Sequence, residues 1–127
     1  MAHNKKRPVD FGVLHSRLPL GALVSILHRV SGLFLVLSLP FAFAVLERSL
    51  ASAAGFAILQ ERVQHIGWRL VLILTVWAFA HHFFAGVRHL LQDIDIGNTR
   101  TSGRLGAGMV LLAGIATAAA VAWRCFV

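Results

Sequence analysis

Three long apolar segments limit what this chain can fold into. They cover about residues 21–46, 68–91 and 105–126 of a 127-residue sequence. A helix needs roughly 20 residues to cross the ~30 Å hydrocarbon layer of a bilayer. Because the backbone in lipid must satisfy its own hydrogen bonds, segments of this length predict transmembrane α-helices. We expect one all-α membrane domain over residues 1–127, with three helices that run up, down and up.

The overall composition favours the same class of protein. Hydrophobic residues make up 57% of the chain and charged residues 13%, against roughly 45–50% and 25% in soluble domains. The net charge of +7 could indicate nucleic-acid binding. However, the basic residues flank the apolar segments, which argues against nucleic acid and favours helix ends at a lipid surface.

Basic residues also predict how the helices are oriented. Eight Lys and Arg residues fall on the side of the N-terminus and of the turn-rich connection at 93–104, and four fall on the opposite side. Because basic loops stay in the cytoplasm, we expect residues 1–20 to be cytoplasmic and the C-terminus periplasmic. The N-terminus has no apolar core followed by a cleavage site. The simplest location is therefore the inner (plasma) membrane of a bacterium.

The connections add two smaller expectations. Residues 47–67 are more polar and predict a loop that can include a short surface helix. Trp68 and Trp123 are expected at the same membrane face, as in an interfacial aromatic belt. The single cysteine, Cys125, can form no internal disulfide, and without a C-x-x-C-H motif any haem must be held noncovalently.

Two polar clusters interrupt the apolar segments. The cluster in the first segment consists of Ser25, His28, Arg29 and Gly32. The cluster in the second segment consists of His82, Gly86, Arg88 and His89. Their spacings of three, four and seven residues put the main members of each cluster on one helix face. Polar residues in a span are costly and indicate function, and both clusters are expected at a similar depth towards the cytoplasm.

Haem binding is the favoured use of the second cluster. A histidine in a span can ligate haem or a metal, relay protons, or hydrogen-bond to another helix. For His82, Gly86 one turn away would leave a flat space for a porphyrin while Nε2 reaches the iron. His81 projects roughly 100° away around the helix and is expected to pack or to hydrogen-bond. The cationic side chains that could pair with haem propionates are His28, Arg29 and Arg88.

The first cluster also suits a quinone. Ser25 and Arg29 lie one helical turn apart and would offer a hydroxyl and a guanidinium to the quinone carbonyl oxygens. The alternatives are a hydrogen bond from Ser25 to its own helix and an Arg29 side chain that only reaches for water. Asp93 ends the second segment, where it could assist proton entry or simply be solvated.

The chain resembles the cytochrome b556 subunits of succinate dehydrogenase. The shared features are Arg7–Pro8, the sequence SILHRVSG at 25–32, and H-x-x-x-G-x-R-H-x-x-x-D at 82–93. The resemblance implies the larger membrane anchor of respiratory complex II, which lies in a heterodimeric helix bundle with a second small anchor subunit. It implies haem b shared with that subunit, and electron transfer to ubiquinone from an iron–sulfur subunit that is supplied by a flavoprotein.

By position, the resemblance makes His82 the axial haem ligand. It assigns Ser25 and Arg29 to the quinone site, and His28 and Arg29 to the propionates. The chain itself would carry no catalytic residue for succinate oxidation, and the second haem ligand would be a histidine of the partner anchor. Two alternatives remain. One is a haem-free structural anchor, as in a related fumarate reductase, in which His82 would be an interhelical hydrogen-bond donor. The other is a proton or cation transporter subunit with a relay of His81, His82 and His89. A transporter predicts an acidic residue within the spans, and residues 70–91 and the third apolar segment contain none.

Overall fold

The computed structural model describes residues 18–127, which form four α-helices and contain no strand. The helices are α1 (Leu20–Ala51), α2 (Ala53–Arg62), α3 (Ile66–Asp93) and α4 (Arg100–Phe126). α1, α3 and α4 are long and apolar enough to cross a membrane. The predicted all-α fold with three candidate membrane spans is confirmed. Most of the predicted cytoplasmic segment, with Arg7–Pro8, lies outside the described residues.

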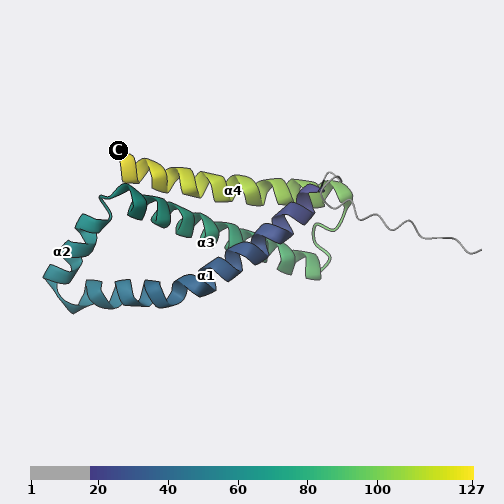
Figure 1. The fold of residues 1–127 in the computed structure, drawn as a ribbon. Coiled ribbons are helices and arrows are strands. Elements are labelled where there is room, and N and C mark those ends of the chain that lie inside the picture. The colour runs from purple at the N-terminus through teal and green to yellow at the C-terminus, as the bar shows by residue number, and fades with distance from the viewer. Residues whose placement is uncertain (1–17) are drawn as a thin grey trace, which may run out of the picture.

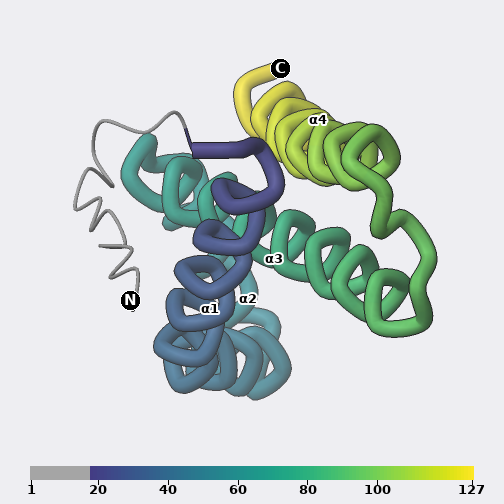
Figure 2. The backbone as a smooth tube through the Cα atoms, turned by 90° about the vertical axis from the view of Figure 1, so that its right-hand side faces the viewer, coloured from purple at the N-terminus to yellow at the C-terminus, as the bar shows by residue number. Residues whose placement is uncertain are grey.

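The central helix of the structure is α3. It packs against both α1 and α4, and α1 contacts α4 less extensively (Figures 1 and 2). The loop between α3 and α4 lies at the same end of the molecule as the start of α1. The opposite end holds α2 and the end of α4 (Figure 1). This arrangement brings the polar stretches of α1 and α3 towards one end.

A small apolar core forms where the three long helices meet. Its buried members are Val24 of α1, Ala85 of α3, and Ala107 and Val110 of α4. Alanines at these positions let the helix backbones approach closely. Large apolar side chains face outwards instead, as Phe41 does with 74% of its surface exposed. An apolar exterior suits a protein whose solvent is lipid.

α1 extends through both polar and apolar sequence. It begins at Leu20 and includes the polar stretch before residue 32, so the apolar run alone does not define the helix. Pro40 lies inside it, yet the helix continues to Ala51. Figure 1 shows that α1 changes direction part-way along its length, and a proline, which cannot donate the helical hydrogen bond, is a usual cause of such a bend.

The connections have ordinary capping chemistry. Ser52 accepts a hydrogen bond at 3.0 Å from the backbone N–H of Gly55 and so caps α2. This short helix lies within the connection predicted to be a loop or surface helix. Between α3 and α4, Asp95 and Gly97 adopt positive φ angles of 62° and 85°. Thr99 then caps α4 by accepting a hydrogen bond from the N–H of Ser102.

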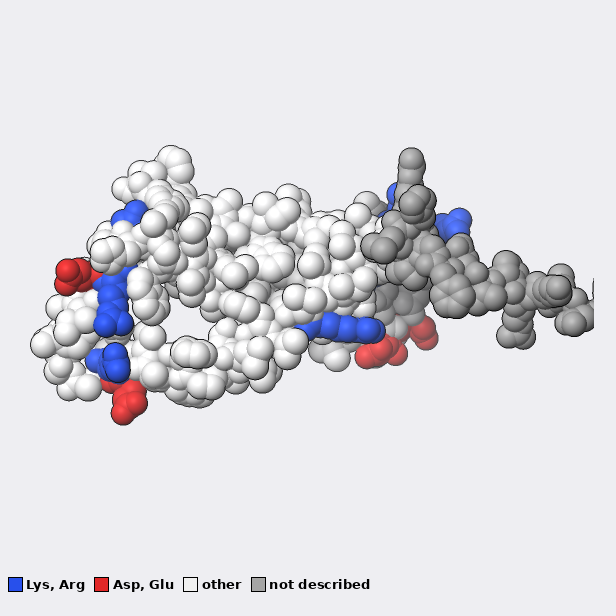
Figure 3. Space-filling model, viewed as in Figure 1, with Lys and Arg blue, Asp and Glu red and all other residues white. Residues whose placement is uncertain are grey.

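Charged side chains gather towards the two ends of the molecule. Figure 3 shows arginine side chains, with acidic side chains nearby, towards both ends of the described part of the molecule, and a mostly uncharged surface between them. Charges are expensive in hydrocarbon and favourable at the headgroups. This distribution matches a molecule that lies across a bilayer along its long axis.

Candidate functional site

The two polar clusters meet between α1 and α3. The imidazole rings of His28 and His82 are stacked, with centroids 4.2 Å apart and planes 13° apart. His89 of α3 also lies beside His28: the two ring centroids are 5.2 Å apart and the ring planes are tilted by 51°. Three histidines from two helices therefore form one group, as the predicted helix faces require.

A hydrogen bond fixes the orientation of His82. Its Nδ1 lies 3.0 Å from the backbone carbonyl oxygen of His28. A carbonyl oxygen can only accept, so the proton of a neutral His82 is on Nδ1. The other nitrogen, Nε2, then keeps its lone pair, which is the form in which histidine binds a metal.

Each of the two stacked histidines lies against a glycine of the other helix. A Cβ atom on Gly32 would lie 2.7 Å from Cε1 of His82, much closer than two such carbons can approach. A Cβ atom on Gly86 would lie 3.5 Å from Nε2 of His28. The absence of a side chain at Gly32 therefore makes room for the His82 imidazole, whereas a Cβ at Gly86 would make only an ordinary van der Waals contact with His28.

The space beside Gly86 differs from the sequence expectation. We expected an open, flat surface there, but the His28 imidazole lies over it. A planar group placed against Gly86 would meet this ring. His82 still suits a haem ligand, because its Nδ1 is held by a carbonyl and its side chain is only partly buried.

His81 is in a different environment from its neighbour. It is completely buried, and neither ring nitrogen has a hydrogen-bond partner among residues 18–127. Its ring is stacked on Trp77 at a centroid distance of 5.5 Å, and Gly114 of α4 lies against its backbone. The contacts are those of a packed side chain, and no face of the ring is open to a planar cofactor.

The two residues expected to bind a quinone differ in exposure. Ser25 is partly buried, and its hydroxyl makes no hydrogen bond within the part of the chain that the structure describes. A hydroxyl bond to the same helix is made instead by Ser31, which donates to the carbonyl oxygen of His28 at 2.9 Å. Arg29 is exposed. Within residues 18–127, neither side chain donates a hydrogen bond to another residue.

Arg88 connects the helices on the side of the α3–α4 loop. Its Nη2 donates to the carbonyl oxygen of Gly103 in the first turn of α4 at 3.3 Å. Its guanidinium also lies close to Gly21 of α1 and Gly106 of α4, where added Cβ atoms would be 3.5 and 3.6 Å away. From its place on α3, the residue expected to pair with a propionate thus bonds to α4 and lies close to the start of α1.

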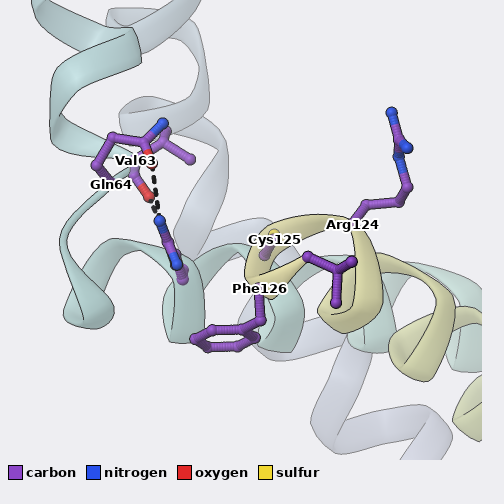
Figure 4. Close-up of a pocket in the computed structure, with 7 residues that line it drawn as sticks. Val63, Gln64, Arg124, Cys125 and Phe126 are labelled. Carbon is purple, nitrogen blue, oxygen red and sulfur yellow. Dashed lines mark hydrogen bonds between the residues drawn. The ribbon is translucent and has the colours of Figure 1, made fainter.

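A surface pocket of about 340 Å³ lies at the other end of the molecule, where α3 begins and α4 ends. Arg69 donates to the carbonyl oxygen of Val63 at 3.2 Å and to Oε1 of Gln64 at 2.7 Å (Figure 4). Its guanidinium carbon is 5.3 Å from the centre of the Phe126 ring, a cation–π distance. Arg124 points away from this group (Figure 4). Because α3 begins and α4 ends here, Trp68 and Trp123 lie at the same end of the molecule, as predicted.

Two residues near the histidine group were not predicted from the sequence: Ser31, which is fully buried, and Trp77, which stacks on His81. Gly32 was placed on the polar face of the first segment, but its contact with a ring of the opposite helix was not predicted. One signal was present in the sequence: His28 and His82 are each followed by a glycine four residues later. This repeated H-x-x-x-G pattern puts each glycine one turn from its histidine.

Comparison with known proteins identifies relatives over nearly the whole chain. The family model described as "Succinate dehydrogenase/Fumarate reductase transmembrane subunit" matches residues 3–121. The chain is 37% identical over 110 residues to a succinate dehydrogenase cytochrome b556 subunit of Coxiella burnetii, covering 86% of this chain and 88% of the relative.

Two further relatives have similar coverage. A cytochrome b556 subunit of Paracoccus denitrificans is 34% identical over 114 residues, which cover 84% of this chain and 86% of the relative. A succinate dehydrogenase cytochrome b560 subunit of Reclinomonas americana is 30% identical over 119 residues, covering 86% and 82%. The family match, over residues 3–121, covers the first two candidate spans and most of the third.

Proposed function

Because the chain belongs to the succinate dehydrogenase/fumarate reductase transmembrane subunit family, we propose that it is the haem b- and quinone-binding anchor of a succinate:quinone oxidoreductase. In this role the chain helps pass electrons from an iron–sulfur subunit to ubiquinone. It lies in a bacterial inner membrane with its N-terminus in the cytoplasm and its C-terminus in the periplasm. The three spans cross the bilayer in alternating directions.

The hydrogen bond from His82 Nδ1 to the carbonyl of His28 joins α3 to α1, as a haem-free anchor would also require, and its use of Nδ1 is the observation that carries the haem proposal. It supports Nε2 of His82 as the axial ligand, since this nitrogen keeps its lone pair. His81 is an unsuitable ligand because its side chain is completely enclosed. When bound, haem b would exchange single electrons. The chain's own contribution is to orient the ligand and to supply the propionate partners His28, Arg29 and Arg88.

The haem site needs a second protein subunit. Two histidines on opposite faces of a haem normally come from two facing helices. His89 lies on α3, two turns from His82, and α4 has no histidine. His28 is the other candidate within the chain, but its carbonyl and ring are already held against α3. We therefore assign the second ligand to the partner anchor, with the iron–sulfur and flavoprotein subunits on the cytoplasmic side.

Ser25 and Arg29 are the proposed quinone donors. The hydroxyl of Ser25 has no internal partner within residues 18–127, and Arg29 is exposed one turn away. A hydroxyl and a guanidinium at this spacing can donate to a quinone carbonyl oxygen while the apolar helix surface accepts the ring.

One spectroscopic experiment tests the proposed function. The complex is purified with all its subunits, and its haem is measured as the pyridine haemochrome and in the dithionite-reduced spectrum. A b-type haem in stoichiometric amount, together with succinate-dependent ubiquinone reduction, is the expected result. A complete and active complex without a Soret band would instead identify the chain as a haem-free structural anchor.

A further inference from the structure

We propose that Gly32 is a positioning residue for the haem ligand. Its missing side chain lets the His82 ring lie against α1, where the His28 carbonyl selects the Nε2 nitrogen for iron. This inference rests on the proposed haem-binding function. It concerns a residue that does not itself contact the cofactor but controls the ligand that does.

Gly32 and the His82 ring are too close for any side chain to fit between them. A Cβ atom at position 32 would be 2.7 Å from Cε1 and 3.1 Å from Nδ1 of the His82 ring. Carbon atoms attract each other best at roughly 3.5–4.0 Å, and repulsion rises steeply below that range. Any residue with a side chain at position 32 would therefore push the ring away from α1.

The hydrogen bond from His82 Nδ1 to the His28 carbonyl oxygen also affects the electron density at the iron-binding nitrogen. Displacing the ring would lengthen the 3.0 Å contact between Nδ1 and the His28 carbonyl oxygen. A hydrogen bond from the second nitrogen fixes the tautomer of a metal-binding histidine and raises its basicity. A more basic axial ligand stabilises ferric iron more than ferrous iron, so this bond lowers the reduction potential of the haem.

Ser31 competes for the same carbonyl oxygen. Its hydroxyl donates to the carbonyl of His28 at 2.9 Å, and the side chain is fully buried beside the ring stack. Because the two donors share one carbonyl oxygen, each of the two hydrogen bonds is weaker than it would be alone. Removing the Ser31 hydroxyl should strengthen the bond from His82, whereas adding a methyl group at Gly32 should weaken it.

The two changes therefore predict potential shifts of opposite sign. In the complete complex, Gly32→Ala should move the haem midpoint potential to a more positive value and change the EPR g-values of the ferric haem. Ser31→Ala should move the potential to a more negative value. Gly108→Ala on α4 is the matched control, because the nearest atom to its added Cβ is Leu20 Cδ2 at an ordinary 4.0 Å. Its potential should equal that of the wild type.

The inference would be overturned if Gly32→Ala kept the wild-type haem content, g-values and midpoint potential. The proposed function would be unaffected by that result. If Gly32→Ala does not assemble, Ser31→Ala decides, since replacing a buried serine by alanine changes little volume. A potential unchanged or raised by Ser31→Ala would then overturn it. A wild-type complex without haem would refute the proposed function and the inference with it.

Discussion

The imidazole of His82 rests on Gly32 while the imidazole of His28, stacked on it at 4.2 Å, covers Gly86. α1 and α3 thus each contribute one histidine and one glycine to a reciprocal contact. The arrangement packs two polar rings between the helices without leaving the His82 Nδ1 proton unsatisfied. A haem bound against Gly86 would have to displace the His28 ring.

We predict that His82→Ala removes most or all of the haem, while His81→Ala retains most of it. His82 keeps the lone pair of Nε2 because its Nδ1 donates to the His28 carbonyl, whereas His81 is enclosed between Trp77 and α4. The measurement is the ratio of haem to protein in purified complexes of equal subunit composition. The assignment would be reversed if His81→Ala alone removed the haem.

Quinone reduction should depend on Ser25 and Arg29. Arg29→Leu removes a charged hydrogen-bond donor worth about 1.5–3 kcal/mol, which corresponds to a decrease of roughly tenfold or more in ubiquinone reduction. Ser25→Ala should have a smaller effect in the same direction. Succinate-dependent reduction of an artificial dye that accepts electrons before the quinone should stay near the wild-type rate. An equal fall in both activities would mean that these residues support assembly rather than quinone binding.

Arg88 should contribute to stability whether or not it also binds a propionate. Its guanidinium donates to Gly103 and lies against α1 and α4. Arg88→Ala should therefore lower the free energy of unfolding by about 1.5–3 kcal/mol, the range for a hydrogen bond to a charged group. The measurement is thermal unfolding in detergent, with Arg104→Ala at an exposed position of α4 as the control. Equal thermal stability of the two variants would contradict this structural role.

The chain on its own should not give a low-spin haem with two histidine ligands. Of the histidines on the three long helices, only His28 could reach the far face of a haem bound to His82, and it is held in the helix contact. The isolated, haem-reconstituted chain should bind haem weakly or show a high-spin, five-coordinate spectrum. Co-expression with the partner anchor should restore the low-spin form. A stable low-spin spectrum from the isolated monomer would instead make His28 the second ligand.

The sequence by itself determined the class of protein and the helices that carry its polar residues. Three apolar segments of sufficient length must form spanning helices, because lipid offers the backbone no hydrogen bonds. The spacing within 25–32 and 82–89 placed His28 near Gly32 and His82 near Gly86 on their helix faces, because the α-helix repeats every 3.6 residues. The motifs of the same two stretches also identified the family.

Only the tertiary structure decided which of these residues touch. The contact of His82 with Gly32, the burial of Ser31 and the reach of Arg88 to Gly103 depend on where α1 and α4 cross α3 and how each helix is rotated. His81 and His82 are adjacent and chemically identical, yet one is sealed against α4 and the other faces α1. Helix crossings result from the packing of many small side chains at once, so local residue spacing cannot specify them.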